Sequence, residues 1–227
     1  MNRRRFFQNS IAAAVATTFA SRAAAWQALA TISDDIQAVT LDRKDTVIEK
    51  AALTELRDAL RGRLLLPGNE GYDTARHVLN ASIDKYPALV VQPTGVADIQ
   101  HAVTFARERD LLVAVKCGGH SWSGKSSCDG GLQIDLSHFR NVRVDPGRRR
   151  AYAAGGSLLG ELDHESMAHG LVTTAGTVSH TGIGGLTLGG GYGRVARRFG
   201  LALDNVRAVD IVTADGQLRR ASADENE

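Results

Sequence analysis

His120 is the residue of this chain whose setting most clearly suggests covalent chemistry. It follows two glycines, in Gly118-Gly119-His120-Ser121. A neutral imidazole is a nucleophile near pH 7, and glycines let the backbone approach a bulky group closely. A second glycine-rich segment, residues 182–193, reads GIGGLTLGGGYG. Together the two segments predict a nucleotide cofactor site, in which backbone N–H groups face the phosphates.

Two common phosphate-binding motifs match parts of these segments. The Rossmann pattern that starts at Gly182 has Thr187 where it needs its third glycine, and no hydrophobic strand precedes it. The phosphate-loop spacing is satisfied by residues 119–126, but turn-forming residues 127–131 follow where that motif needs a helix. A chance match is therefore favoured, and a phosphate-loop nucleotide-binding protein stays as a weaker alternative.

The elements that must position these segments alternate between strand and helix from Pro87 onward. Apolar β-branched runs predict strands, and apolar residues on one helical face predict helices. The predicted strands are at 89–92, 111–115, 132–136 and 142–144, and residues 149–153 lead into a turn or bulge at Gly155-Gly156. The other predicted elements are a helix containing Ile99, Ala102, Val103 and Ala106, a helix behind Ser157, a short helical turn at 195–198, and a hairpin of 206–213 with 218–221. The glycine–histidine loop follows the second strand, where ligands bind in α/β sheets.

The residues before this region divide into two parts. Residues 1–25 start with arginines and two phenylalanines, continue with a short apolar stretch and end in small residues, which is typical of a twin-arginine-like signal peptide. This pattern predicts export to the periplasm or the cell exterior, and the apolar stretch is too short to span a membrane. Residues 26–82 are expected to form a helical lead-in, because Ile48, Ala52, Leu56 and Leu60 have helical spacing.

The charge balance and the cysteines restrict the possible partners. The 27 basic and 25 acidic residues nearly balance, and the basic ones are scattered, so no nucleic-acid-binding surface is predicted. Cys117 and Cys128 match no metal-ligand spacing, and we expect no metal site. An oxidising compartment would allow a disulfide between them, but two unpaired thiols are favoured.

From Pro87 to Glu227 the chain resembles the FAD-binding domain of the vanillyl-alcohol-oxidase superfamily, in the berberine-bridge-enzyme-like branch. The resemblance rests on the strand–helix–strand start, the loop at 115–121, the strand at 132–136 and the glycine segment at 177–193, in the family's order and spacing. It implies an α+β fold of the PCMH type, with two small α/β subdomains over residues 83–227 that hold FAD.

The resemblance also implies which residues hold the cofactor. The histidine matching His120 carries the flavin through its 8α-methyl carbon, and many relatives add a cysteine link where this chain has Val178, so we expect a single 8α-histidyl attachment. For His180, a hydrogen bond that shapes the flavin site is favoured over a catalytic role. The expected cofactor-binding residues are Lys116, Cys117, Gly118, Gly119, His120, Ser121, Thr177, Val178, His180, Thr181, Gly184, Gly185, Gly189, Gly190, Tyr192 and Gly193.

The function implied is that of an FAD-dependent oxidoreductase. It would take a hydride from a C–H bond of a sugar, alcohol or secondary metabolite onto flavin N5, and oxygen or another acceptor would reoxidise the flavin. In relatives, the residue at the position of Leu186 lies beside the oxygen-reactive face of the flavin. A bulky side chain there would slow the access of oxygen and favour a dehydrogenase. Relatives are longer and carry a substrate domain with the catalytic base. We therefore expect a chain truncated at its C-terminus, with a non-catalytic flavin-binding remnant or a partner-dependent module as the alternative.

Overall fold

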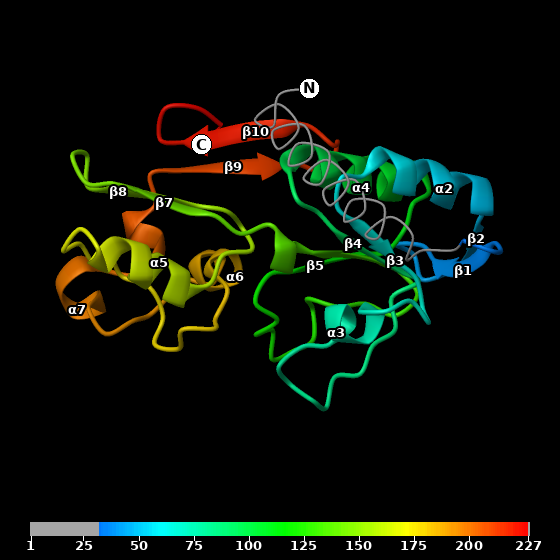
Figure 1. The fold of residues 1–227 in the computed structure, drawn as a ribbon, viewed down its shortest axis with the longest axis horizontal. Helices are drawn as coiled ribbons and strands as arrows, with labels where there is room; N and C mark the ends of the chain where they lie inside the picture. Colours follow the sequence, from blue (N-terminus) through cyan, green and yellow to red (C-terminus); the bar gives the residue numbers. More distant parts are fainter. Residues whose placement is uncertain (1–31, 227) are drawn as a thin grey trace, which may run out of the picture.

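The computed structural model describes residues 32–226, which form a sheet with helices on both faces and a smaller region beside it (Figure 1). The expected signal peptide, residues 1–25, lies outside the described residues. Within the described part of the chain, no helix is both long and apolar enough to cross a membrane.

A four-stranded sheet forms the centre of the larger region (Figure 1). In the strand order β3-β4-β6-β5, β6 pairs in parallel with both β4 and β5, and β3 runs antiparallel to β4. The strands are β3 (Arg63–Leu65), β4 (Leu89–Gln92), β5 (Val113–Lys116) and β6 (Leu132–Asp135). The strands predicted at 89–92 and 132–136 are confirmed. The one predicted at 111–115 begins at Val113, because Leu111 forms an isolated bridge with Thr40.

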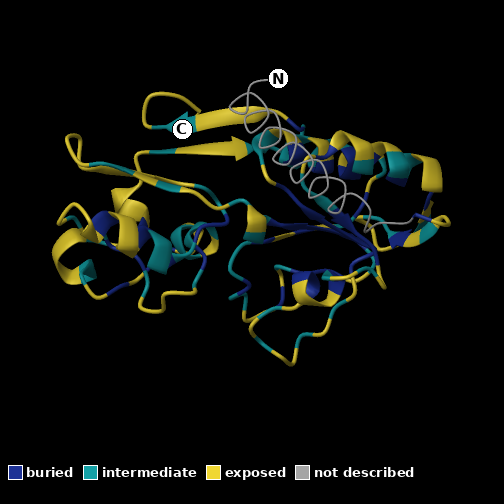
Figure 2. Ribbon diagram, viewed as in Figure 1, coloured by how far each residue is buried: buried dark blue, intermediate teal, exposed yellow. Residues whose placement is uncertain are grey.

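Helices cover this sheet from both sides, so its central strands are buried on both faces (Figure 2). In β4, Leu89 and Val91 belong to the main core with helices α2 (Lys50–Ala59) and α4 (Val96–Glu108). Val90 belongs to a second cluster with helix α3 (Tyr72–Arg76) on the other face. Successive side chains of a strand point to opposite faces, and burial on both explains why β4 is an uninterrupted apolar run.

The lead-in expected to be helical contains strands as well. Helix α2 is present, and it buries Leu53 and Leu56. However, a hairpin of β1 (Ile36–Val39) and β2 (Asp45–Ile48) precedes it, and β3 follows as part of the central sheet. One core cluster also contains residues from both parts of the chain, from Ile32 in the lead-in to Ile134 in β6. The described part of residues 26–82 therefore combines two helices with three strands, and the sequence did not predict the strands because they are too short to show periodicity.

The smaller region packs around three helices and one hairpin. Leu159 and Leu162 form its core with Ala175, and Val142, Ile183 and Leu186 pack against them. Its elements are β7 (Val142–Asp145) and β8 (Arg150–Ala153), paired antiparallel, and helices α5 (Leu159–Met167), α6 (Ile183–Leu188) and α7 (Ala196–Phe199).

The last hairpin returns the chain to the larger region. Strands β9 (Ala208–Val212) and β10 (Leu218–Ser222) pair antiparallel, as predicted. The side chains of Gln100 and Arg107 on α4 donate to the carbonyl oxygens of Gly216 and Asp215 in its turn, at 2.9 and 2.6 Å. The two regions are thus connected at the end of the chain as well as through the glycine segments.

Candidate functional site

The two glycine-rich segments touch each other, although they lie far apart in the sequence. A Cβ atom placed on Gly118 would lie 2.3 Å from the backbone nitrogen of Gly182. A Cβ atom on Gly182 would lie 2.3 Å from Cys117 Sγ and 2.4 Å from the nitrogen of Gly118. No side chain fits at either position, so the contact between the backbones explains both glycines.

The first segment, residues 117–121, leaves the sheet at the end of β5. Lys116, the last residue of β5, is paired in register with Asp135 of β6. Its ammonium lies 3.5 Å from the Asp135 carboxylate and donates to the backbone oxygens of Ala75 and, at 3.4 Å, His77. Lys116 is one of the expected cofactor-binding residues; its side chain is 6% exposed, and its ammonium makes these contacts inside the protein.

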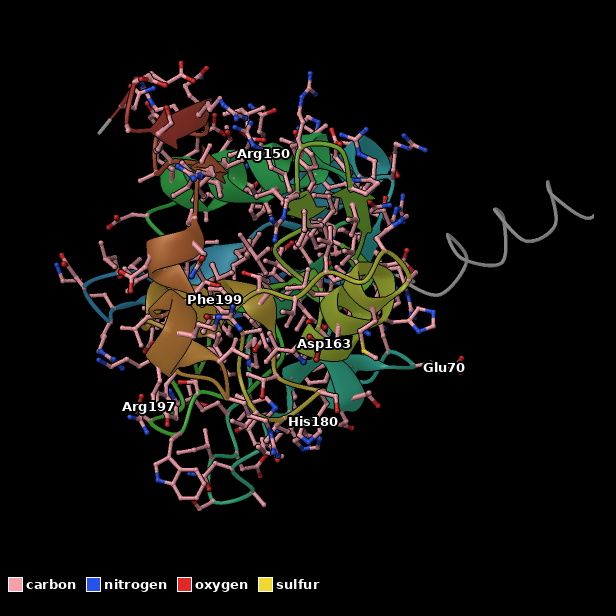
Figure 3. The ribbon with its side chains drawn as sticks, turned by 90° about the vertical axis from the view of Figure 1, so that its left-hand side faces the viewer. Glu70, Arg150, Asp163, His180, Arg197 and Phe199 are labelled. Atoms are coloured by element: carbon pink, nitrogen blue, oxygen red, sulfur yellow. The ribbon has the colours of Figure 1, made fainter. Side chains whose placement is uncertain are left out.

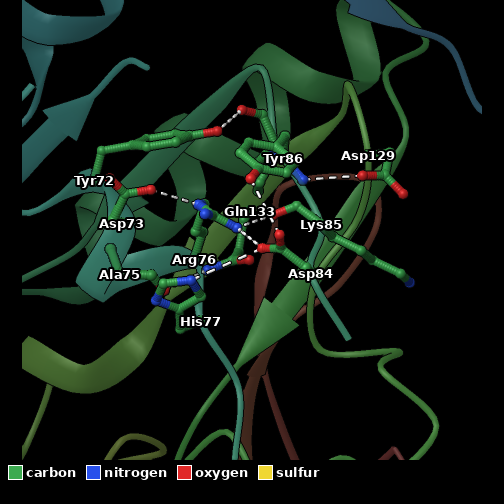
Figure 4. A network of polar contacts seen from close by, with 11 residues as sticks. Tyr72, Asp73, Ala75, Arg76, His77, Asp84, Lys85, Tyr86, Asp129 and Gln133 are labelled. Carbon is green, nitrogen blue, oxygen red and sulfur yellow. Dashed lines mark hydrogen bonds and ion pairs between the residues drawn. The ribbon is translucent and has the colours of Figure 1, made fainter. Parts of the chain in front are cut away.

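A polar network on the α3 side supports this loop (Figure 4). The buried guanidinium of Arg76 binds Asp73 at 2.7 Å and also pairs with Asp84. Tyr86 donates to Asp84 at 3.1 Å, and its ring lies under the Arg76 guanidinium. Immediately after α3, the N–H of Leu79 donates to the oxygen of Gly119 at 2.9 Å. The network therefore fixes the segment on which the glycine–histidine loop rests.

Cys117 holds the two regions together through its thiol. Cys117 Sγ donates to the oxygen of Gly155 at 2.7 Å, and it lies against Gly182. A Cβ atom on Gly184 would also come within 2.9 Å of that oxygen. Cys117 and Cys128 are both free thiols. The role of Cys117 in this structure is thus to pack three loops together.

The second segment forms helix α6 and then a tight turn. Gly190 and Gly191 have backbone φ angles of 101° and 75°, which residues other than glycine rarely adopt. The turn is fixed where Ala202 N donates to Gly191 O at 2.8 Å. A Cβ atom on Gly193 would lie 2.0 Å from Ala175 O. These glycines are explained by the packing of the chain on itself.

Gly185 differs from its neighbours. A Cβ atom there would meet nothing within 4 Å, and the residue is exposed on the first turn of α6. Gly189, at the end of the same helix, is exposed too. The described residues therefore give no packing reason for a glycine at position 185.

His120 and His180 form a pair at the junction of the segments. Nε2 of His120 lies 2.8 Å from Nδ1 of His180, and the ring centroids are 4.7 Å apart with the planes tilted by 35°. Partial burial lowers the pKa of His120 below its ordinary value, and a positive charge on His180 would lower it further. His120 is therefore neutral near pH 7.

His180 lies on the face of the molecule that Figure 3 shows, and hydrogen bonds hold its backbone on both sides. The oxygen of Ser179 accepts from Gly160 N at 2.8 Å, and that of Thr181 accepts from Leu159 N at 3.0 Å. Both donors lie in the first turn of α5. The His180 side chain is exposed, so this helix positions it without covering it.

The other predicted site residues flank this junction. Ser121 accepts from Gly124 N at 3.1 Å and, through its hydroxyl, from Lys125 N at 3.0 Å. These bonds form turns, and no helix follows in the described residues 121–131, so the phosphate-loop alternative is not supported. Thr177, Val178 and Tyr192 are exposed, and Thr181 is half-buried.

Leu186, in helix α6, is partly buried. Its side chain packs against the core of the smaller region, and Cβ atoms placed on Gly176 and Gly191 would lie 2.6 and 2.7 Å from its methyl groups. Packing therefore fixes its position within the smaller region, and its effect on oxygen access stays a prediction.

Sequence reasoning missed Thr174, which lies just before the second segment. Its hydroxyl is buried and has no hydrogen-bond partner among the described residues. Such a group usually has a partner, supplied by water or a ligand. Nothing in the local sequence distinguishes this threonine from Thr173.

Comparison with known proteins identifies the fold around this site. Residues 87–222 match the family described as FAD binding domain. An FAD-linked oxidoreductase of Dictyostelium discoideum is 35% identical over 175 residues, which cover 77% of this chain and 38% of that protein. The chain thus spans less than two fifths of the length of this relative.

Two solved structures share the architecture. The 6-hydroxy-D-nicotine oxidase of Arthrobacter nicotinovorans superposes with a TM-score of 0.72 at 30% identity, covering 74% of this chain and 37% of that one. The berberine-bridge-enzyme-like protein 1 of Physcomitrella patens superposes with a TM-score of 0.72 at 33% identity, covering 77% and 38%. The expected α+β fold of the PCMH type is confirmed.

Proposed function

The chain belongs to the FAD binding domain family, in the berberine-bridge-enzyme-like branch of the FAD-linked oxidoreductases, and from this we propose that its two glycine segments hold FAD with His120 as the single covalent anchor. The observation that carries the proposal is the junction itself. The Gly118–Gly182 contact joins the loop that carries His120, whose pKa is lowered, to the segment that carries His180 and Gly185, an exposed glycine with open space around it.

The described residues fit such a cofactor. Gly185 has no neighbour that would exclude a side chain, so its lack of one leaves space for an approaching group. Thr174 offers a buried hydroxyl without a partner. His120 supplies an uncharged nucleophile, whereas Val178 offers no thiol for a second bond. Glycine backbone, hydroxyl and imidazole are the groups expected around a flavin nucleotide.

In this proposal FAD supplies the two-electron acceptor for a hydride from the substrate C–H bond. The chain's own residues hold it in place. Gly118 and Gly182 fix the distance between the segments, and the ion pair of Lys116 with Asp135 anchors the loop that carries His120. Positioning of this kind supplies much of the acceleration in enzymes.

The substrate is proposed only as a class, a small organic molecule with an oxidisable C–H bond, and oxygen or another acceptor would take the electrons onward. The relatives described above include an FAD-linked oxidoreductase and a nicotine oxidase, and the chain covers 37% of the length of the nicotine oxidase. Residues beyond the match would contribute the substrate pocket and the catalytic base. A flavin-binding module that needs a partner segment is the alternative function.

The covalent anchor can be tested directly on the purified chain. After denaturation, flavin fluorescence should stay with the wild-type polypeptide, and its mass should exceed the sequence mass by that of one FAD. His120→Ala should lose the bound mass. His101→Ala, an exposed histidine on α4, serves as the matched control and should keep it. Covalent flavin in His120→Ala would contradict the proposed anchor, and no flavin binding in any variant would contradict the proposed function.

We also propose that the chain is exported, on the basis of residues 1–25 alone. Replacing Arg3 and Arg4 with lysine should retain a reporter fusion in the cytoplasm, because that export route reads the arginine pair. Unchanged export would contradict the assignment.

A further inference from the structure

The contact between His120 and His180 leaves one ring nitrogen of His120 uncommitted. Nε2 of His120 forms a hydrogen bond with Nδ1 of His180 at 2.8 Å. A hydrogen bond between two neutral imidazoles needs one N–H and one lone pair, so two arrangements are possible. In one, His120 carries its proton on Nε2 and donates to His180. In the other, His180 donates, and His120 carries its proton on Nδ1.

Only the first arrangement makes His120 reactive. The nitrogen that attacks an electrophile must have a free lone pair. With the proton on Nε2, the lone pair of His120 lies on Nδ1, the nitrogen that His180 does not use. In the second arrangement both nitrogens of His120 are occupied. The direction of this hydrogen bond therefore decides whether His120 can form a bond to the cofactor.

We propose that His180 is a positioning residue for covalent attachment of the flavin: it accepts the Nε2 proton of His120 while Nδ1 of His120 bonds to the 8α carbon. The proposal rests on the proposed function, and it adds to that function the attacking nitrogen and the group that receives the proton. Three observations carry it: the 2.8 Å contact, the fixed backbone on both sides of His180, and the exposure of its ring.

The step balances in atoms and electrons. One N–C bond forms, one C–H bond of the 8α-methyl group breaks, and the imidazole loses its Nε2 proton to His180. The two electrons of the broken bond go to the flavin ring, which also takes up the two protons, one from the methyl group and one passed on by His180. Dioxygen then removes two electrons and two protons as hydrogen peroxide, which restores the oxidised flavin.

The surroundings of His120 are consistent with this role. Bond formation at Nδ1 would leave a cationic ring if Nε2 kept its proton. Partial burial already disfavours a charged His120, as the lowered pKa indicates. A base that accepts the Nε2 proton of His120 keeps the ring neutral. His180 is exposed, so it can pass the proton to water or to the flavin.

The central experiment follows covalent attachment over time. The chain is produced in riboflavin-starved cells and mixed with FAD, and covalent flavin is measured after denaturation, with non-covalent affinity measured in parallel. We expect His180→Ala to bind FAD but to attach it at least about tenfold more slowly, since positioned proton acceptors contribute roughly 10²–10⁴-fold. His101→Ala, matched in residue type and exposure, should behave as wild type.

Two further tests separate proton transfer from simple orientation. His180→Asn keeps an oxygen near the place of Nδ1 that can accept the hydrogen bond, but an amide does not take up a proton at this pH. We expect its attachment rate to stay at least about tenfold below wild type, by the same reasoning. Added imidazole should raise the rate of His180→Ala, with a pH dependence that follows the imidazole. A wild-type rate in His180→Asn, or no response to imidazole, would overturn the proton-accepting role.

The tautomer can be read without any cofactor. Long-range ¹H–¹⁵N spectra of the cofactor-free chain should show the His120 proton on Nε2, and this preference should weaken in His180→Ala. A proton on Nδ1 would overturn the inference. The outcomes also separate the two proposals: a wild-type chain that attaches no FAD contradicts the covalent anchor, whereas equal attachment rates in wild type and His180→Ala contradict only the role of His180.

Discussion

Lys116 and Asp135 form an ion pair at the paired ends of β5 and β6, with 3.5 Å between Nζ and Oδ1, and their side chains are only 8% and 1% exposed. Asp135 also accepts from Gln92 at 2.9 Å and from the Ser137 hydroxyl at 2.9 Å. The pair therefore joins the strand that precedes the glycine–histidine loop to the centre of the sheet.

Removing the cation from this pair should destabilise the fold. Lys116→Met leaves a buried carboxylate without its partner, and we expect a loss of about 3–5 kcal/mol in the free energy of unfolding by urea. Lys116→Met combined with Asp135→Asn should recover part of that loss, since it removes the uncompensated charge. Lys125→Met, at an exposed lysine, should change stability by less than about 0.5 kcal/mol. Equal stability of Lys116→Met and wild type would show that the pair carries no such role.

Two glycines of the second segment should respond in opposite ways to alanine. Gly182→Ala places a methyl group against Cys117 Sγ and Gly118 N, and we expect a loss of about 1–3 kcal/mol in stability. Gly185→Ala meets no atom within 4 Å and gains helix propensity, so stability should rise by at most about 1 kcal/mol.

The same pair separates folding from cofactor binding. If Gly185 leaves space for FAD, Gly185→Ala should bind it more weakly while remaining fully folded. Fluorescence titration with FAD, alongside urea unfolding, measures both quantities. Undiminished FAD affinity in Gly185→Ala would mean that the cofactor does not approach this residue.

The two thiols should differ in reactivity. Burial raises the pKa of Cys128 to about 11, so it stays protonated and covered at pH 8. Cys117 is half-buried. A thiol reagent should therefore modify Cys117 slowly in the native chain, since its Sγ packs against Gly182 and donates to Gly155 O, and Cys128 only on unfolding. Cys117→Ser should abolish the slow reaction of the native chain. Modification of native Cys117→Ser at the same rate would contradict this assignment.

The lowered pKa of His120 predicts in which direction the stability of the fold changes with pH. As the pH falls, His120 takes up a proton near its ordinary pKa of 6.5 in the unfolded chain, and only at a lower pH in the folded chain. Any stability that neutral His120 preserves is therefore complete above pH 6.5 and decreases as the pH falls below that value. Replacing His120 with Asn should make the midpoint of urea unfolding less sensitive to acid. An NMR titration of the ring should give a pKa below 6.5, and a higher value would contradict the structure.

The sequence predicted the parts of the fold that carry their own periodicity. Strand β4 and helix α4 were evident, because each is long or apolar enough to show a pattern. Strands β1 and β3 were missed, since three or four residues with a polar member look like loop. Long-range pairing in the sheet, and not local preference, makes them strands.

The candidate site was predictable residue by residue but not as an arrangement. His120 and His180 were both singled out, yet nothing in their spacing predicts that their rings meet. Lys116 was expected to bind the cofactor because it belongs to the loop that resembles the family's, but the sequence did not predict that its side chain points into the sheet. Which way such a side chain points depends on Asp135 in another strand, which no local pattern reveals.

The His120–His180 contact joins residues 60 positions apart, one from each region of the molecule. The pair cannot exist until both regions have folded and docked, so attachment of a flavin through it could begin only at that point. A covalent bond persists when the chain later unfolds. The flavin content of a denatured sample would then count the molecules that had once reached the native arrangement, as a lasting record of folding history.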